Sequence, residues 1–153
     1  MRYSISGAGG AASATAATAG IIKAEAHGTN PQRLKIYEWS VGPGAAAEDS
    51  NYTVRAKRQS TAGTWTTVTA RPLDSGSSED TDRVPVGGRA STAAGTAGNI
   101  LGEFGFNQRG GFRWVAVPGG ELIIPATAAN GIIIEYAVIQ GTAVNYATIY
   151  VED

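Results

Sequence analysis

The chain has 153 residues, a length that suits one domain, and it carries 12 basic against 13 acidic residues for a formal net charge of −1. A charge this close to zero gives no field that would hold a nucleic acid or an anionic membrane. The absence of cysteine excludes disulfides, thiolate metal sites and cysteine nucleophiles, and a single histidine excludes a multi-histidine metal site. We also expect no membrane span and no secretory signal peptide, because no segment is sufficiently apolar.

The large apolar residues are few and unevenly placed. Valine, isoleucine, leucine and phenylalanine total 29 residues, a share that would suggest disorder in a highly charged chain. Residues 1–99 hold 11 of them and residues 100–153 hold 18. Isoleucine and valine together number 22 against 4 leucines, and β-branched side chains favour strands over helices. The composition therefore predicts an all-β protein with a dense C-terminal half.

The first twenty residues read as a strand followed by an arm. Residues 2–6 alternate polar and apolar side chains, as a half-buried strand does. Residues 7–20 contain only alanine, glycine, serine and threonine, so they have no large side chain whose burial would offset the entropy of ordering. We therefore expect residues 1–20 to form an N-terminal strand and an extended Ala/Gly-rich arm. Residues 21–153 would form the folded domain.

Four further strands are predicted before residue 99, at 21–26, 33–41, 51–58 and 64–70. In the second of these, alternation places Leu34 and Ile36 on one face. It places Tyr37, Trp39 and Val41 on the other. In the third, Tyr52, Val54 and Ala56 point inward. The polar stretch 71–99 is predicted to be a long loop with one weak strand near 83–86.

The last third is regular. Five strands are predicted, separated by turns rich in glycine and proline: 100–106, 112–117, 121–124, 131–140 and 144–152. No strand alternates with a helical pattern, which disfavours α/β folds. This succession of strands indicates a single β-sandwich that is jelly-roll-like.

Two motifs resemble ligand sites but lack the context that those sites need. Residues 7–12 read GxGxxA after a strand, yet the strand is interrupted by polar residues and no βα unit follows, so we expect no dinucleotide site. The segment 74–82 gathers four carboxylates, but their spacing fits no EF-hand, and such loops are ordinarily solvated turns. We therefore expect no bound metal and no cofactor.

No residue is expected to be catalytic. His27 lies in a turn with no nucleophile at a suitable spacing. Paired carboxylates on the C-terminal strands could act on a glycosidic bond, but alternation turns Glu103 and Glu135 outward, where acids serve as solubilising groups. We therefore do not expect an enzyme or a small-molecule substrate.

The aromatic and basic residues indicate surfaces instead. Trp39 and Trp114 are expected in the core or at a subunit interface, because large aliphatic side chains are scarce. Trp65, between two threonines, is the tryptophan expected to be exposed. Arginine outnumbers lysine nine to three and is favoured at protein interfaces. The candidate interface residues are Arg55, Lys57, Arg58, Arg109 and Arg113, and a solvated strand face is the alternative.

With the strands placed, the chain resembles the small capsid decoration, or cement, proteins of tailed bacteriophages. The resemblance lies in Leu34–Glu38 (LKIYE), Glu103–Trp114 (EFGFNQRGGFRW), Pro118–Leu122 (PGGEL) and the final Ile149–Glu152 (IYVE). It implies a non-enzymatic virion protein, made in the host cytoplasm. Such a protein would sit on the outer surface of the shell as a homotrimer and bind the major capsid protein.

On that hypothesis the N-terminal arm would contact the capsid through Arg2, Tyr3 and Ile5, by adding a strand to an exposed sheet edge. The alternative is a carbohydrate- or receptor-binding β-sandwich module of a phage tail or fibre. That module would use Trp65 and nearby tyrosines.

Overall fold

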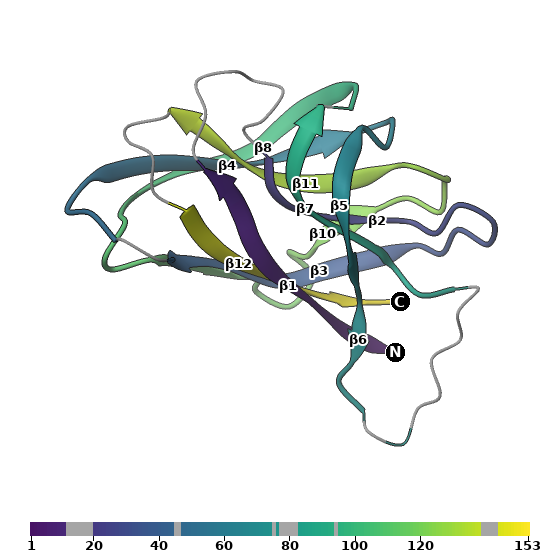
Figure 1. Cartoon of the computed structure of the whole chain (residues 1–153). Coiled ribbons are helices and arrows are strands. Elements are labelled where there is room, and N and C mark those ends of the chain that lie inside the picture. The colour runs from purple at the N-terminus through teal and green to yellow at the C-terminus, as the bar shows by residue number, and fades with distance from the viewer. Residues whose placement is uncertain (12–19, 45–46, 75, 77–82, 94, 139–143) are drawn as a thin grey trace.

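In the computed structural model the chain folds into two antiparallel β-sheets packed together, as in a β-sandwich (Figure 1). The structure describes residues 1–11, 20–44, 47–74, 76, 83–93, 95–138 and 144–153. The strands are β1 (Arg2–Ala11), β2 (Gly20–Glu25), β3 (Leu34–Pro43), β4 (Asn51–Gln59), β5 (Thr64–Thr69), β6 (Arg71–Pro72), β7 (Val86–Ala93), β8 (Ala97–Asn107), β9 (Phe112–Val115), β10 (Leu122–Ile124), β11 (Gly131–Val138) and β12 (Val144–Glu152). The predicted all-β class is confirmed. Within the described ranges, no helix has the length and apolar character to cross a membrane.

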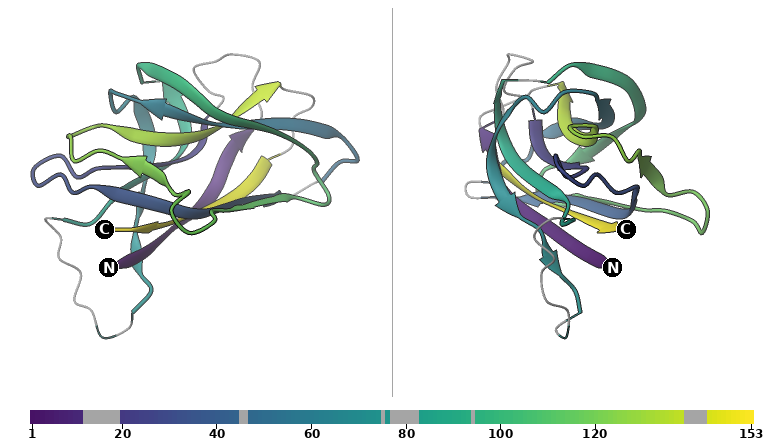
Figure 2. Two further views of the ribbon diagram at one scale, coloured as in Figure 1. Left: turned by 180° about the vertical axis from the view of Figure 1, so that it is seen from behind. Right: turned by 90° about the vertical axis from the view of Figure 1, so that its right-hand side faces the viewer.

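Each sheet combines strands from both ends of the chain. The first sheet has the order β10-β3-β12-β1-β6, and β9 pairs with β3 beside β10. The second sheet has the order β5-β7-β2-β11-β4-β8. Figure 2 shows the two layers from two further sides, with both chain ends at the same end of the first sheet. There the N-terminal amine pairs with the Asp153 carboxylate.

The strand predicted at residues 2–6 is present, and it continues to residue 11 as β1 of the first sheet. β1 pairs with β12 from Arg2 to Ala8, and on its other side Tyr3 pairs with Pro72 of β6. Tyr3 and Ile5 are buried in the core. The small residues that follow extend the strand because they permit close packing: a Cβ on Gly9 would lie 2.7 Å from Ile21. The remainder of the expected arm, 12–19, lies outside the described residues.

A β-bulge in β3 changes the predicted facing of its side chains. Ile36 pairs with Val151, but the next pair toward the C-terminus is Glu38 with Tyr150, so Tyr37 is the extra residue. The bulge reverses the alternation after Ile36. As a result, four side chains of β3 point into the core: Leu34, Ile36, Trp39 and Val41. The sequence pattern had divided these four residues between two faces of the strand, and that prediction is wrong. The inward set on β4, Tyr52, Val54 and Ala56, is confirmed.

Strand β7 occupies part of the stretch 71–99 that the sequence predicts to be a loop, and it begins at Val86, where the weak strand expected near 83–86 ends. Its glycines are needed for packing rather than for flexibility. A Cβ on Gly87 would lie 2.6 Å from the Val68 carbonyl oxygen and 2.7 Å from Ile5. A Cβ on Gly88 would lie 2.8 Å from Trp65. Bare backbone at both positions lets β7 lie against β5 and β1, so the sequence that suggested a loop forms a strand in which Gly87 and Gly88 are buried.

The core between the sheets is filled mainly by isoleucines and by a cluster of aromatic rings. Trp39 is 1% exposed and lies edge-on to Phe104, with ring centroids 5.7 Å apart. Phe112 stacks on Phe104 at 4.8 Å and lies 5.1 Å from Trp39. These three rings join β3, β8 and β9. Because the chain has few leucines, these large aromatic side chains provide much of the apolar area that is buried between the sheets.

The close packing at Gly87 predicts a difference between two glycine substitutions. Gly87→Ala should lower the free energy of unfolding by about 1–3 kcal/mol, because the added methyl group overlaps backbone and Ile5. Gly28→Ala is the matched control, since nothing lies within 4 Å of its Cβ position, and it should change stability by less than about 0.5 kcal/mol. Urea denaturation followed by tryptophan fluorescence measures both. Equal midpoints for the two variants would contradict the packing described for β7.

Candidate functional site

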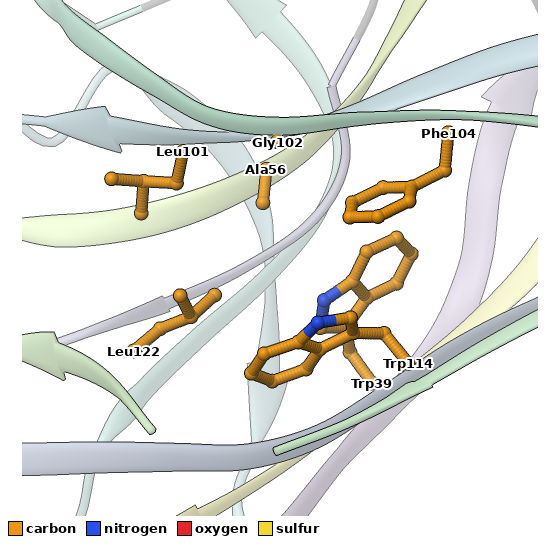
Figure 3. Close-up of a pocket in the computed structure, with 7 residues that line it drawn as sticks. All are labelled: Trp39, Ala56, Leu101, Gly102, Phe104, Trp114 and Leu122. Atoms are coloured by element: carbon orange, nitrogen blue, oxygen red, sulfur yellow. The ribbon is translucent and has the colours of Figure 1, made fainter. Parts of the chain in front are cut away.

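A narrow apolar slot lies where the two sheets part, along the edge formed by β8, β9 and β10 (Figure 3). Its volume is about 70 Å³. Seven residues line it: Trp39, Ala56, Leu101, Gly102, Phe104, Trp114 and Leu122. Both indoles project from the first sheet toward Ala56 and Leu101 of the second (Figure 3).

The slot follows from the pairing of its walls. Trp39 and Trp114 are cross-strand partners in β3 and β9, so their indoles lie next to each other on the inner face. In the opposite sheet Ala56 pairs with Gly102. One of these residues has a single methyl group and the other has no side chain, so they leave space above the indoles. Leu122 on β10 closes the lower wall.

The chemistry of the slot is that of a binding site for one apolar group. None of its lining residues carries an ionisable side chain, so nothing in it can perform acid–base work. The Trp39 indole N–H is buried and has no hydrogen-bond partner.

A buried polar network holds the connection between β8 and β9 in place. Gln108 and Asn145 are fully buried, and the Gln108 side-chain amide donates to Asn145 Oδ1 at 3.2 Å. Asn145 in turn donates to the Tyr136 hydroxyl at 2.8 Å. The Glu48 backbone N–H donates to Gln108 Oε1 at 2.6 Å. Burial raises the pKa of Tyr136 to about 12, although its hydrogen bond from Asn145 opposes the shift.

The predicted interface cations on β4 are occupied by ion pairs. Arg55 Nε lies 2.6 Å and Lys57 Nζ lies 3.2 Å from Glu135 Oε1, and Glu135 is 3% exposed. Glu103 lies 3.7 Å from Arg55. Glu135 and Glu103 thus occupy the predicted outward face, but Glu135 is buried there as the shared partner of two cations. Arg55 and Lys57 therefore stabilise the second sheet and are not free to bind another charged group.

The other three predicted interface cations lie on different surfaces. Arg58 points between the sheets and donates to the Ile123 carbonyl oxygen at 2.9 Å. Arg109 is exposed in the turn after β8. Arg113, on β9, donates to both carboxylate oxygens of Glu38 at 2.7 and 2.9 Å. Those two hydrogen bonds hold the pKa of the Glu38 carboxyl below its usual range. The five cations therefore do not form one patch.

Trp65 is half-buried rather than exposed. Its ring lies over the Lys23 ammonium at 5.7 Å, and its indole N–H is buried without a partner. Gly20 and Gly88 provide the room, because a Cβ on either would lie within 2.8 Å of the tryptophan. Beneath it Lys23 pairs with Glu25 at 2.5 Å, and the Gln59 amide donates to the same carboxylate at 2.9 Å. This tryptophan covers a buried ion pair.

The remaining sequence motifs have structural roles or cannot be placed. Residues 7–11 of the GxGxxA motif continue β1 without the turn that a phosphate-binding loop requires. His27 Nδ1 accepts hydrogen bonds from the Thr29 and Asn30 amides, so it organises the turn after β2. Most of the acidic segment 74–82 lies outside the described residues. Among those that are described, no three carboxylates or histidines are grouped as metal ligands.

Sequence reasoning did not find the slot. Trp39 lies in the core as predicted, but Trp114 is half-buried along the opening between the sheets. The sequence around Trp114 carried no signal for an opening, because the strand expected at 112–117 is longer than β9, which ends at Val115. Pairing of Ala56 with Gly102 could not be seen without the register of β4 and β8.

Comparison of the chain with models of known protein families, with curated protein sequences and with solved structures gave no match.

The buried hydroxyl of Tyr136 predicts how stability changes at alkaline pH. Because the pKa of Tyr136 is about 12 in the fold and about 10 when unfolded, the stability it contributes is present below pH 10 and is lost as the pH rises toward 12. Raising the pH from about 9 to about 11.5 should cost about 2 kcal/mol through this group. Tyr136→Phe should remove that part of the slope in urea unfolding. Tyr146→Phe, which changes an exposed ring, is the matched control and should keep the slope of the unsubstituted protein.

Proposed function

We propose that this chain is a non-enzymatic virion protein that binds the outer surface of a phage capsid as a homotrimer and stabilises contacts between coat subunits. The observation that carries the proposal is the order in which its strands pair. β1 pairs with β12, β2 with β11, β3 with β9 and β10, and β4 with β8. This nested pairing of early with late strands supports a jelly-roll reading of the sandwich, because a jelly roll is a long hairpin rolled into two sheets.

In that reading the chain has a jelly roll with one extension. Four-stranded halves β1-β12-β3-β9/β10 and β2-β11-β4-β8 face each other, and β5, β6 and β7 extend the sheets beyond β1 and β2. Jelly rolls recur in viral capsid proteins and in lectins. A fold that serves several functions does not identify the function of this chain. The choice between a capsid-binding protein and a glycan-binding module therefore depends on the exposed surfaces.

The outer face of the first sheet favours a protein partner. Tyr37 and Tyr150 lie 6.1 Å apart, and the Arg2 guanidinium lies 5.4 Å from the Tyr37 ring. Tyr146 is 56% exposed, and Arg113 has an exposed side chain. Tyrosine and arginine are enriched at protein interfaces, where their large groups make contact with little loss of conformational freedom. The outer face of the first sheet is therefore suited to contact with a broad, flat surface of a partner protein.

Only one of the three residues proposed to form the N-terminal capsid contact is accessible to a partner. Of the three arm residues expected to touch a capsid, Arg2 is exposed, whereas Tyr3 and Ile5 pack inside the fold. Deletion of residues 1–20 would remove β1 from between β12 and β6. Loss of binding after that deletion would therefore report unfolding. A charge-reversing Arg2→Glu variant is the appropriate probe of this contact.

The capsid proposal is tested by mixing the purified protein with expanded shells that lack decoration. We expect it to co-sediment with the shells, to raise the temperature at which they dissociate, and to elute as a trimer in size-exclusion chromatography with light scattering. The thermally unfolded protein, added at the same concentration, is the control and should give no protection. Absence of the folded protein from pelleted shells would overturn the proposal.

A second candidate function, glycan binding, is favoured by the exposed Tyr146 and its neighbour Tyr150 on the same sheet face, since aromatic rings stack on sugars. It predicts binding on a glycan array that Tyr146→Ala weakens about tenfold or more. Trp65→Ala, the substitution suggested by sequence, should act through stability instead, because that ring covers Lys23. An array without signal would remove this candidate.

A further inference from the structure

The outer edge of β8 is an unpaired sheet edge. β8 ends the second sheet, and its segment Gly102–Asn107 pairs in regular register with β4 on one side. In the described part of the chain, no strand pairs with its other side. Alternate backbone N–H and C=O groups along that side therefore lack strand partners. Exposed edges are commonly protected by lysine or proline, yet β8 contains neither, and its one charged residue is Glu103.

The slot opens beside this edge. β8 contributes Leu101, Gly102 and Phe104 to the slot, while Trp114 and Leu122 form the wall that belongs to the first sheet. A strand added alongside β8 would place alternate side chains on the inner face of the sheet, which is the face that the slot occupies. Figure 3 shows that the Leu101 and Leu122 side chains lie on the same side of the two indoles. Backbone pairing and side-chain insertion are thus available together.

The lining specifies what kind of side chain would fit. A volume of about 70 Å³ between apolar walls accepts one medium-sized apolar side chain. The unpartnered Trp39 N–H, on a side chain that is 1% exposed, would gain an acceptor. Methionine meets both requirements, because its flexible thioether is apolar, packs well against aromatic rings and is a weak acceptor.

We propose that the outer edge of β8 and the slot form one docking site for an extended segment of a partner protein. The segment adds to β8 as a further strand and inserts one apolar side chain, best a methionine, between Trp114, Leu122 and Leu101. Main-chain hydrogen bonds then provide affinity and the slot provides specificity. That the partner is a capsid protein rests on the proposed function; the docking chemistry itself does not.

The direct test is titration of the full-length, ¹⁵N-labelled protein with a capped peptide of alternating threonine and valine around a central methionine. We expect millimolar binding, with the largest NMR shifts at the β8 amides and at the Trp39 indole N–H. A peptide with aspartate in place of the methionine should bind about tenfold more weakly or not at all. Absence of binding by the methionine peptide, or shifts elsewhere on the surface, would overturn the inference.

Two variants separate the slot from general stability. Leu101→Phe should fill the slot and weaken the methionine peptide about tenfold, while leaving the thermal midpoint near that of the unsubstituted protein. Leu73→Ala, which trims an exposed leucine outside the slot, is the matched control and should bind as the unsubstituted protein does. Equal affinity in Leu101→Phe would contradict insertion into the slot. Loss of an oligomer in Leu101→Phe, seen by light scattering, would show that a second copy occupies the edge instead.

Shell binding then tests the identity of the partner. If the unsubstituted protein loads shells and Leu101→Phe loads them less, the segment belongs to the capsid. Equal loading by both proteins would exclude the capsid protein as the source of the docked segment. A failure of the unsubstituted protein to load shells would overturn the proposed function, while the peptide titration would still decide the docking site.

Discussion

The packing of Trp39 is the contact on which the arrangement of the two sheets depends. This chain has few leucines and phenylalanines, so one indole and two phenyl rings provide much of the apolar area between β3, β8 and β9. The bulge at Tyr37 is what turns Trp39 inward. If alternation continued unbroken through β3, Trp39 would lie on the opposite face from Ile36, and the sheets would lose their aromatic contact. A single inserted residue therefore determines the composition of the core.

Strand content could be predicted from β-branched residues and turn signals, and the strands from Gly131 and Val144 onward follow the expected pattern. The two stretches whose strands were missed share one physical cause. β1 beyond Ser6 and β7 consist of glycine, alanine and other small residues, whose composition resembles that of a loop. Their role becomes visible only when Gly9 and Gly87 are seen against Ile21 and Ile5. The local sequence shows which side chains a strand can bury. It does not show where the backbone must come close to another strand, because that depends on residues distant in the sequence.

The candidate site shows the same limit. Both slot tryptophans were visible in the sequence, yet the empty space between them and the second sheet depends on which residues of β4 and β8 are paired. Ala56 opposite Gly102 makes the space, and the register that pairs them includes irregularities immediately afterward. The charged residues show a related limit, because the sequence pattern gives the face on which a cation lies but not the carboxylate with which it pairs. Arg55 and Lys57 looked available because the pattern placed them outward, but Glu135 lies on the same face one strand away and forms ion pairs with both.

The nested pairing of the strands has a consequence for synthesis of the chain. β12 lies between β1 and β3 in the first sheet, with Arg2 opposite Glu152. Until β12 has emerged from the ribosome, the edges of β1 and β3 that it covers have no native partner, although both strands were made long before it. Contacts of such large sequence separation form slowly. Newly made chains therefore pass through an interval with two open strand edges, during which association between chains competes with folding.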